Sequence, residues 1–257
     1  MSSDLNSVLG DWAYDPAAIN ARWIMGLDGR PKIQLRLDLG LLQMEISGRP
    51  DGARPRGFTS LYDYFQDLEK RAEQSSGKIQ FSSADLAELQ QEAVQYYYRY
   101  IALYAMRDLD RVVQDTEHNL KLIELVSRNA ENGDVAWQFV QFFPYVRMMN
   151  ARARAERAAD RKAFDEAIQT VESAIGEIQK FWREHEERRE SENATREVEM
   201  LTDLLDDIQQ VRPKSEMDRL REELDRAIDK EDYEKAAQLR DKINTLSAPA
   251  KHTHSGA

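Results

Sequence analysis

The residues best suited to metal or acid–base chemistry are four histidines, and none of them belongs to a complete site. His118 follows Asp115 by three residues, which would place both side chains on one face of a helix at a spacing that metal ligands use. No second His or group of acids accompanies them, so the sequence favours a surface His. His252 and His254 form a pair near the end of the sequence, and one such pair does not make a dedicated metal site.

A second group of residues could bind another chain. Residues 96–100 read Tyr-Tyr-Tyr-Arg-Tyr, and four more aromatic side chains lie between residues 139 and 145. Consecutive aromatic residues on a helix point in different directions, so some must be exposed or lie at an interface. They could line a peptide groove, but core packing is favoured because aromatic residues dominate buried area. Nearby acids are expected to pair with several of the surrounding arginines, which are Arg99, Arg107, Arg147, Arg152 and Arg154.

Composition excludes several classes of function. The 257 residues include no Cys, so disulfides, thiolate metal sites and Cys nucleophiles are absent. A net charge of −11 disfavours direct nucleic-acid binding. No secretory leader and no run of 18 apolar residues is visible, which predicts a cytoplasmic chain that does not enter a membrane. Neither a phosphate loop nor a Ser-His-Asp pattern is present, and we expect no cofactor and no enzymatic activity.

The first region, residues 1–58, carries the clearest strand pattern. Apolar and polar residues alternate from Ile33 to Leu39, and the alternation resumes on shifted parity from Leu42 to Ile46. A bulge or tight turn at Gly40 would explain the shift, so we predict a strand pair or one bent strand. Earlier in the chain, Asp15-Pro16 is expected to open a short helix.

The second region, residues 59–212, has a helical period throughout. A capping-box pattern at Ser82–Asp85 opens a long helix, and a second long helix follows it. A third helix is predicted over residues 135–160, with a kink or split at Pro144, and a fourth over residues 163–199. These helices are expected to form two stacked antiparallel hairpins.

Small and apolar residues in the second of these hairpins resemble a tetratricopeptide unit. Small side chains at such spacings let two helices approach closely. The first-helix signature of that unit is missing, so the resemblance predicts a helical-repeat-like shape and not a binding activity. The residues concerned are Ala155, Phe164, Ala167, Val171 and Ala174.

The third region, residues 213–247, is predicted to be a further helical hairpin. Arg212-Pro213-Lys214 is the expected domain boundary, because Pro213 stops the preceding helix. Ser215–Asp218 is a second capping-box pattern, and a break is expected near Lys230–Asp232 between two amphipathic helices. Residues 248–257 are expected to form a disordered tail.

This C-terminal hairpin is the predicted binding site. Isolated helices of about 12–15 residues are marginal in water, so two short helices cannot bury their apolar stripes alone. The stripe must cover another surface, and we favour a partner protein over packing within the chain. The predicted partner-binding residues are Leu220, Leu224, Ile228, Tyr233, Ala236, Ala237, Leu239, Arg240 and Ile243.

The same segment resembles a known motif. Residues 230–241 read Lys-Glu-Asp-Tyr-Glu-Lys-Ala-Ala-Gln-Leu-Arg-Asp, which is similar to the UVR motif shared by the UvrB and UvrC subunits of bacterial excision repair. The motif also occurs in activators of protein-arginine kinases and in Clp-type chaperones. In that family the hairpin docks on another such hairpin or on a partner. The resemblance therefore implies protein binding, with Tyr233 at the contact.

The predicted fold is mainly α, with antiparallel helical hairpins, a small N-terminal β-hairpin and a C-terminal helical hairpin. We predict a non-enzymatic adaptor that docks a protein partner, which the resemblance implies could be another protein with a UVR motif. Self-association is also expected, because the strand pair and the C-terminal hairpin both leave surfaces that need covering. Two alternatives remain: an accessory factor in DNA excision repair that recruits a nuclease or binds DNA and, ranked last, an enzyme with its site in the N-terminal region.

Overall fold

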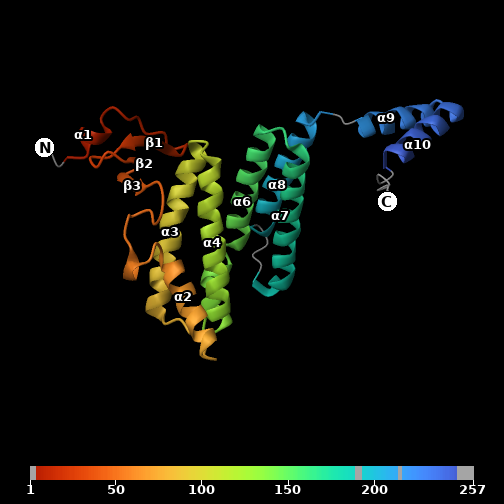
Figure 1. Cartoon of the computed structure of the whole chain (residues 1–257). Coiled ribbons are helices and arrows are strands. Elements are labelled where there is room, and N and C mark those ends of the chain that lie inside the picture. Colours follow the sequence, from red (N-terminus) through yellow and green to blue (C-terminus); the bar gives the residue numbers. More distant parts are fainter. Residues whose placement is uncertain (1–3, 189–192, 214–215, 248–257) are drawn as a thin grey trace, which may run out of the picture. The chain divides into compact units, whose positions relative to one another are not determined.

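The computed structural model describes residues 4–188, 193–213 and 216–247. The chain forms two compact units, Met1–Gln209 and Gln210–Ala257 (Figure 1). The first contains a small antiparallel sheet and a set of helices packed as hairpins, and the second contains a pair of helices. The predicted fold class is confirmed.

The sheet consists of β1 (Asn20–Met25), β2 (Pro31–Leu37) and β3 (Gly40–Glu45), in the order β1-β2-β3. Ile33 pairs with Met44 across β2 and β3, and both are buried in the core shared with α3 (Ser83–Ala105). The register pairs odd-numbered residues of β2 with even-numbered residues of β3. The parity shift therefore comes from a two-residue hairpin turn at Asp38–Leu39, not from a bulge.

The N-terminal segment differs from the prediction in two ways. Strand β1 was not predicted, and the expected helix at Asp15-Pro16 is wrong. A short helix, α1, lies instead at Asn6–Leu9. The carboxamide of Asn20 accepts a hydrogen bond from the Asp15 amide (3.0 Å) and donates one to the Asp15 carbonyl (2.7 Å). The second bond uses the carbonyl that the first turn of a helix would need, and together the two bonds close a loop directly before β1.

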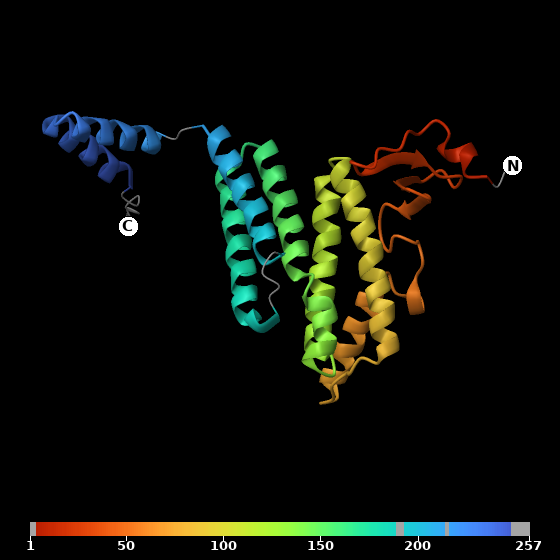
Figure 2. The same cartoon turned by 180° about the vertical axis from the view of Figure 1, so that it is seen from behind.

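The helices of the first unit form two antiparallel hairpins that lie side by side. In Figures 1 and 2, α3 packs against α4, α4 lies beside α6, and α6 packs against α7. The sheet sits near one end of α3, and α8 lies along the hairpin formed by α6 and α7. The other α-helices of this unit are α2 (Leu61–Gln74), α4 (Leu109–Asn129), α5 (Gly133–Val140), α6 (Phe143–Asp160), α7 (Phe164–Glu184) and α8 (Asn193–Val211).

Most helix boundaries follow the sequence signals. Ser82 and Asp85 form the predicted capping box at the start of α3. The predicted third helix splits into α5 and α6, and Pro144 lies in the first turn of α6. The predicted fourth helix is too long, because α7 ends at Glu184. There the imidazole Nδ1 of His185 donates to the Phe181 carbonyl over 2.8 Å, which caps the last turn.

Two clusters of buried side chains hold the first unit together. The larger one joins the sheet with α3, α4, α6, α7 and α8, and Tyr100 and Val112 are among its most deeply buried members. The smaller one joins α2 with the adjoining parts of α3 and α4 around Phe65 and Leu89. Of the five residues with tetratricopeptide-like spacing, Phe164 is half-buried. The other four are fully buried, and they are Ala155, Ala167, Val171 and Ala174. Their small side chains permit the close contact of α6 with α7.

Candidate interaction surface

The second unit is a helical hairpin made of α9 (Glu216–Asp229) and α10 (Tyr233–Ser247). Glu231 lies between the helices with φ of 59°, in the left-handed region. The amide of Asp232 donates to the Ala227 carbonyl, and the amide of Glu231 donates to the Ile228 carbonyl. This is a Schellman motif, which ends α9 and reverses the chain. The break predicted near residues 230–232 is confirmed, whereas the predicted cap Ser215 and residues 248–257 lie outside the described residues.

Some of the predicted partner-binding residues hold the hairpin itself together. Ala236 and Leu239 of α10 are buried against Ala227 of α9. Leu220 and Leu224 of α9 pack on this small cluster. These side chains are therefore used within the hairpin, and Ile243, which is half-buried, follows them along α10.

The remaining predicted residues are exposed. Tyr233 is 70% exposed, Ile228 is 50% exposed, and Ala237 is exposed as well. The Arg240 side chain is also exposed, and its guanidinium lies 3.8 Å from the Asp241 carboxylate. Because Tyr233, Ala237 and Arg240 are spaced by four and three residues, they form one stripe along α10. We call these three residues the α10 flank.

Among the described residues, the turn of this hairpin also ends α2, where Ser76 has φ of 58°, and it occurs in both hairpins of the first unit. Arg107 joins α3 to α4 with φ of 62°, and Lys162 joins α6 to α7 with the same φ. In each case the following residue donates to a carbonyl five residues back, at Leu103 and at Ala158. The turns of all three hairpins are thus Schellman motifs with a charged residue where Gly is usual. Aligning the three sequences at these turns pairs the residues of the hairpins one to one.

That correspondence gives each residue of the α10 flank two equivalents in the first unit. On α4 they are Leu109, Val113 and Thr116, and all three are buried. The side that these residues occupy faces α6, where Asn150 Nδ2 donates to Thr116 Oγ1 over 2.9 Å. On α7 the equivalents are Phe164, Ile168 and Val171. All three pack in the larger core, and Val171 is fully buried. The flank is therefore covered in both hairpins of the first unit and open in the second.

The similarity to known families is confined to this hairpin. Residues 214–248 match the family model of the UvrB/uvrC motif, UVR. The match lies within the second unit and does not extend into the first. No curated protein and no solved structure shows a significant match to the chain. The UVR hairpin thus brings Tyr233 and its neighbours to an open surface, while the first unit is characterised by its structure alone.

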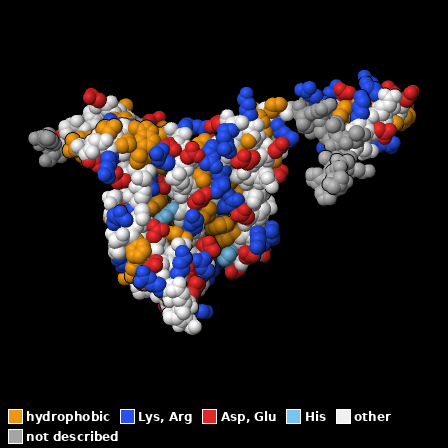
Figure 3. All heavy atoms as spheres, viewed as in Figure 1, with side chains coloured by type: hydrophobic (Ala, Val, Ile, Leu, Met, Phe, Trp, Pro, Cys, Tyr) orange, Lys and Arg blue, Asp and Glu red, His pale blue; other side chains and the backbone are white. Residues whose placement is uncertain are grey.

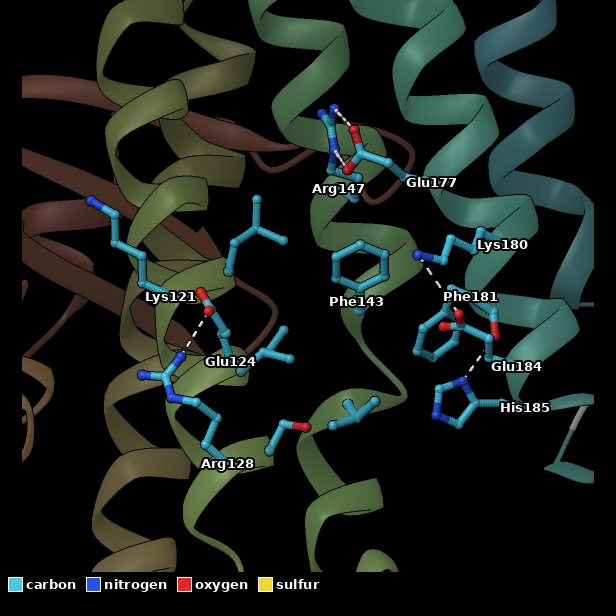
Figure 4. A pocket seen from close by; sticks show the side chains of 14 residues that line it. Lys121, Glu124, Arg128, Phe143, Arg147, Glu177, Lys180, Phe181, Glu184 and His185 are labelled. Carbon is cyan, nitrogen blue, oxygen red and sulfur yellow. Dashed lines mark hydrogen bonds and ion pairs between the residues drawn. The ribbon is translucent and has the colours of Figure 1, made fainter. Parts of the chain in front are cut away.

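A cleft in the first unit lies between α4, α6 and α7 (Figure 4). Figure 3 shows apolar side chains gathered in this part of the surface, between charged ones. Phe143 and Phe181 lie in the cleft with their ring centroids 5.3 Å apart. Arg147 donates two hydrogen bonds to Glu177, of 2.7 and 2.8 Å, and this contact lowers the pKa of the Glu177 carboxyl. Most of the charged side chains in the wall form ion pairs, so the cleft presents an aromatic surface rather than a charged one.

A buried polar network was not predicted from the sequence. Glu92 is fully buried and accepts hydrogen bonds from the amides of Leu61 (2.7 Å) and Tyr62 (3.0 Å) at the start of α2. His118 Nε2 lies 3.1 Å from its carboxylate, and the His118 ring stacks on Tyr96. The prediction of a surface His is therefore wrong. No spacing could have revealed the pair, since its members lie on different helices 26 residues apart.

The electrostatics of this network suit a structural role. Burial alone would raise the pKa of Glu92, but the hydrogen bonds from His118 and the two backbone amides outweigh it and lower the pKa. Nearby, Arg99 donates two hydrogen bonds to Asp115, of 2.8 and 2.6 Å, as expected for an arginine near acids. A further Arg99 bond to the Glu45 carbonyl (3.0 Å) ties the end of β3 to α3. The network thus joins the N-terminal region to the helical hairpins.

The described residues contain neither a metal cluster nor a membrane-spanning helix. Within residues 4–188, 193–213 and 216–247, no three His, Asp or Glu side chains gather in a way that could hold a metal ion. In the same part of the chain, no helix is both long and apolar enough to cross a membrane.

Proposed function

We propose that this chain is a non-enzymatic adaptor of the cytoplasm whose UVR hairpin docks a partner protein through the α10 flank. The observation that supports this most strongly is the contrast in burial at equivalent positions. Leu109 and Val113 of α4 are 6% exposed, whereas Tyr233 of α10 is 70% exposed. A large aromatic side chain left open at a position that is covered elsewhere in the chain favours an intermolecular contact.

The first unit also suggests the shape of the partner. In α4 the covering element is another helix, α6, and the contact combines apolar packing with several polar bonds, among them the bond from Asn150 to Thr116. By analogy, the α10 flank would receive a helix with apolar side chains opposite Tyr233 and Ala237. An acidic or polar side chain would lie opposite Arg240, whose charge is exposed. A helix of another UVR-type hairpin, or of a second copy of this chain, fits that description.

The test is affinity capture of the full chain from its native cells, with the captured proteins quantified by mass spectrometry. Tyr233→Ala and Arg240→Glu should each reduce capture of a specific protein by about tenfold or more, because Tyr and Arg are typical interface hot spots. Phe142→Ala is the matched control, since Phe142 is a 52% exposed aromatic side chain in the first unit.

The outcome of this capture decides between docking and a structural role for the hairpin. If wild type, Tyr233→Ala and Phe142→Ala capture the same proteins in the same amounts, the docking role is wrong. Sedimentation velocity over a range of protein concentrations tests whether the partner is a second copy of this chain. Self-association that Tyr233→Ala abolishes would show that it is.

A role in DNA excision repair is the second candidate, and the UVR match is the observation that favours it. The chain would then recruit a nuclease or bind DNA. The net charge of −11 argues against direct DNA contact. Retention of the full chain on duplex DNA at physiological salt, with a steep loss on adding salt, would support direct binding. Capture of a UVR-containing nuclease subunit that Tyr233→Ala abolishes would support recruitment.

A further inference from the structure

A second cavity of the first unit lies between α3, α4 and the junction of α5 with α6. Its volume is about 510 Å³, within the range of small-molecule sites. Aromatic side chains form much of its wall, among them Tyr97 of α3 and Phe139 and Tyr145 on the other side. This cavity is distinct from the cleft in Figure 4, whose walls carry ion pairs.

Among the residues that the structure describes, the lining of this cavity contains no charged side chain. Charged residues make up 32% of the whole chain, so an uncharged wall is a specific feature of this place. Desolvating an ion here would not be repaid by an opposite charge. The wall therefore selects an uncharged occupant.

Asn119 supplies a polar group without a partner. Its side chain lines the cavity and is 4% exposed. Asn119 Nδ2 donates to the Ala93 carbonyl over 3.0 Å, and this bond fixes the amide orientation because a carbonyl oxygen can only accept. Among the described residues, nothing donates to Asn119 Oδ1. The oxygen is itself closed to solvent, so a ligand donor reaches it only when the neighbouring side chains shift. A buried acceptor left unpaired is costly, so a bound molecule with an N–H or O–H would gain by meeting it through such a shift.

The entrance of the cavity is apolar. Phe142 and Val94 at its rim are 52% and 44% exposed, and Tyr97 is 36% exposed. Burial raises the pKa of Tyr145 to about 12, so its hydroxyl keeps its proton at neutral pH and remains uncharged. Open aromatic faces around a buried acceptor suit a flat apolar molecule with a single donor.

We propose that this cavity binds an uncharged, mainly aromatic small molecule that donates one hydrogen bond to Asn119 Oδ1. This site goes beyond the adaptor function and uses different residues. The two proposals therefore succeed or fail independently.

N-Phenyl-1-naphthylamine is a suitable probe, because it is uncharged and aromatic, carries one N–H, and brightens in apolar surroundings. Its fluorescence should rise with the full chain and saturate at one molecule per chain. Tyr97→Ala should weaken the binding by about tenfold, since an aromatic wall is lost. Tyr233→Ala is the matched control for adhesion to any exposed aromatic residue, and it should leave binding unchanged.

The hydrogen bond is tested with the N-methyl derivative of the same amine, which has no donor. The wild-type chain should bind the parent amine about fivefold or more tightly than the derivative, as a hydrogen bond of ordinary strength allows. Asn119→Ala should remove that preference, provided that circular dichroism shows the variant to be folded. Equal binding of both amines by the wild-type chain would overturn the proposed bond even if the variant fails to fold. Binding that does not saturate, or that Tyr97→Ala leaves unchanged, would overturn the site.

Discussion

The helical hairpins of the first unit and the UVR hairpin share one turn but differ in what covers them. In the first unit, Arg107 and Lys162 take the left-handed conformation at the turn, and Glu231 does so in the UVR hairpin. The second helix of each hairpin then starts with a large side chain, Leu109, Phe164 or Tyr233, and only Tyr233 is largely exposed. The same local structure therefore serves as core in one region and as an open surface in the other.

This difference in burial indicates that the apolar stripe of a hairpin has two parts. One part closes the hairpin on itself, as Ala236 and Leu239 do on α10. The other part, the flank, requires a third helix. In the first unit, α6 supplies that helix to α4. For the UVR hairpin we propose that a partner supplies it.

The largest difference between the two regions should appear when a buried charge loses its partner. Arg99→Leu leaves Asp115 buried and unpaired and should destabilise the first unit by about 3–5 kcal/mol. Arg240→Leu on the exposed flank should change hairpin stability by no more than about 0.5 kcal/mol. All four Trp residues precede residue 210, so urea unfolding followed by Trp fluorescence reports on the first unit, and amide exchange reports on the hairpin.

The double variant Arg99→Leu/Asp115→Leu is the control for this charge effect. It removes both charges and should recover part of the lost stability. A single Arg99→Leu variant with wild-type stability would mean that the ion pair does not matter to the fold.

Equivalent flank residues should respond differently to truncation. Leu109→Ala removes a buried side chain and should lower the unfolding free energy of the first unit by about 2–4 kcal/mol. Tyr233→Ala should change protection of the hairpin amides by no more than about 0.5 kcal/mol, because its side chain is exposed. A large loss of hairpin protection in Tyr233→Ala would show that Tyr233 holds the hairpin together and is not free to dock a partner.

A smaller and pH-dependent effect is expected at Glu92. Its pKa is lowered in the folded chain, so its ionised carboxylate contributes stability above the unfolded pKa of about 4.5, and that contribution is lost as pH falls through the folded pKa. Glu92→Gln should cost about 1–3 kcal/mol at pH 7. Parallel urea titrations of both chains between pH 7 and pH 3 should show the difference shrinking toward pH 3. A difference that stays constant would mean that the ionised form has no special role.

The sequence predicted the elements better than their contacts. Periodicity and capping signals located the long helices, and Pro144 correctly marked the split between α5 and α6. Strand β1 was missed because its six residues follow a loop that the Asn20 carboxamide closes, and no local pattern announces that contact. The predicted helix through residue 199 failed because a charged sequence gives no sign of the cap at His185.

The binding site was predicted only as a single stripe, for a physical reason. Periodicity places Leu224, Tyr233 and Leu239 on apolar faces but cannot tell which of them the hairpin uses internally. The repeated turn was also hidden, since Arg, Lys and Glu stand where Gly would signal a left-handed residue. Only the folded chain separates the interior from the flank.

The most direct test of docking through the α10 flank is photo-crosslinking in the native cell. A photoreactive phenylalanine would replace Ala237 on the α10 flank in one full-length chain and Lys242, about 170° around the helix from the flank, in another. We predict that the chain labelled at position 237 crosslinks to one specific protein, within a helical segment, and that the chain labelled at position 242 does not. Equal crosslinking from both positions, or none from position 237, would contradict docking through the α10 flank.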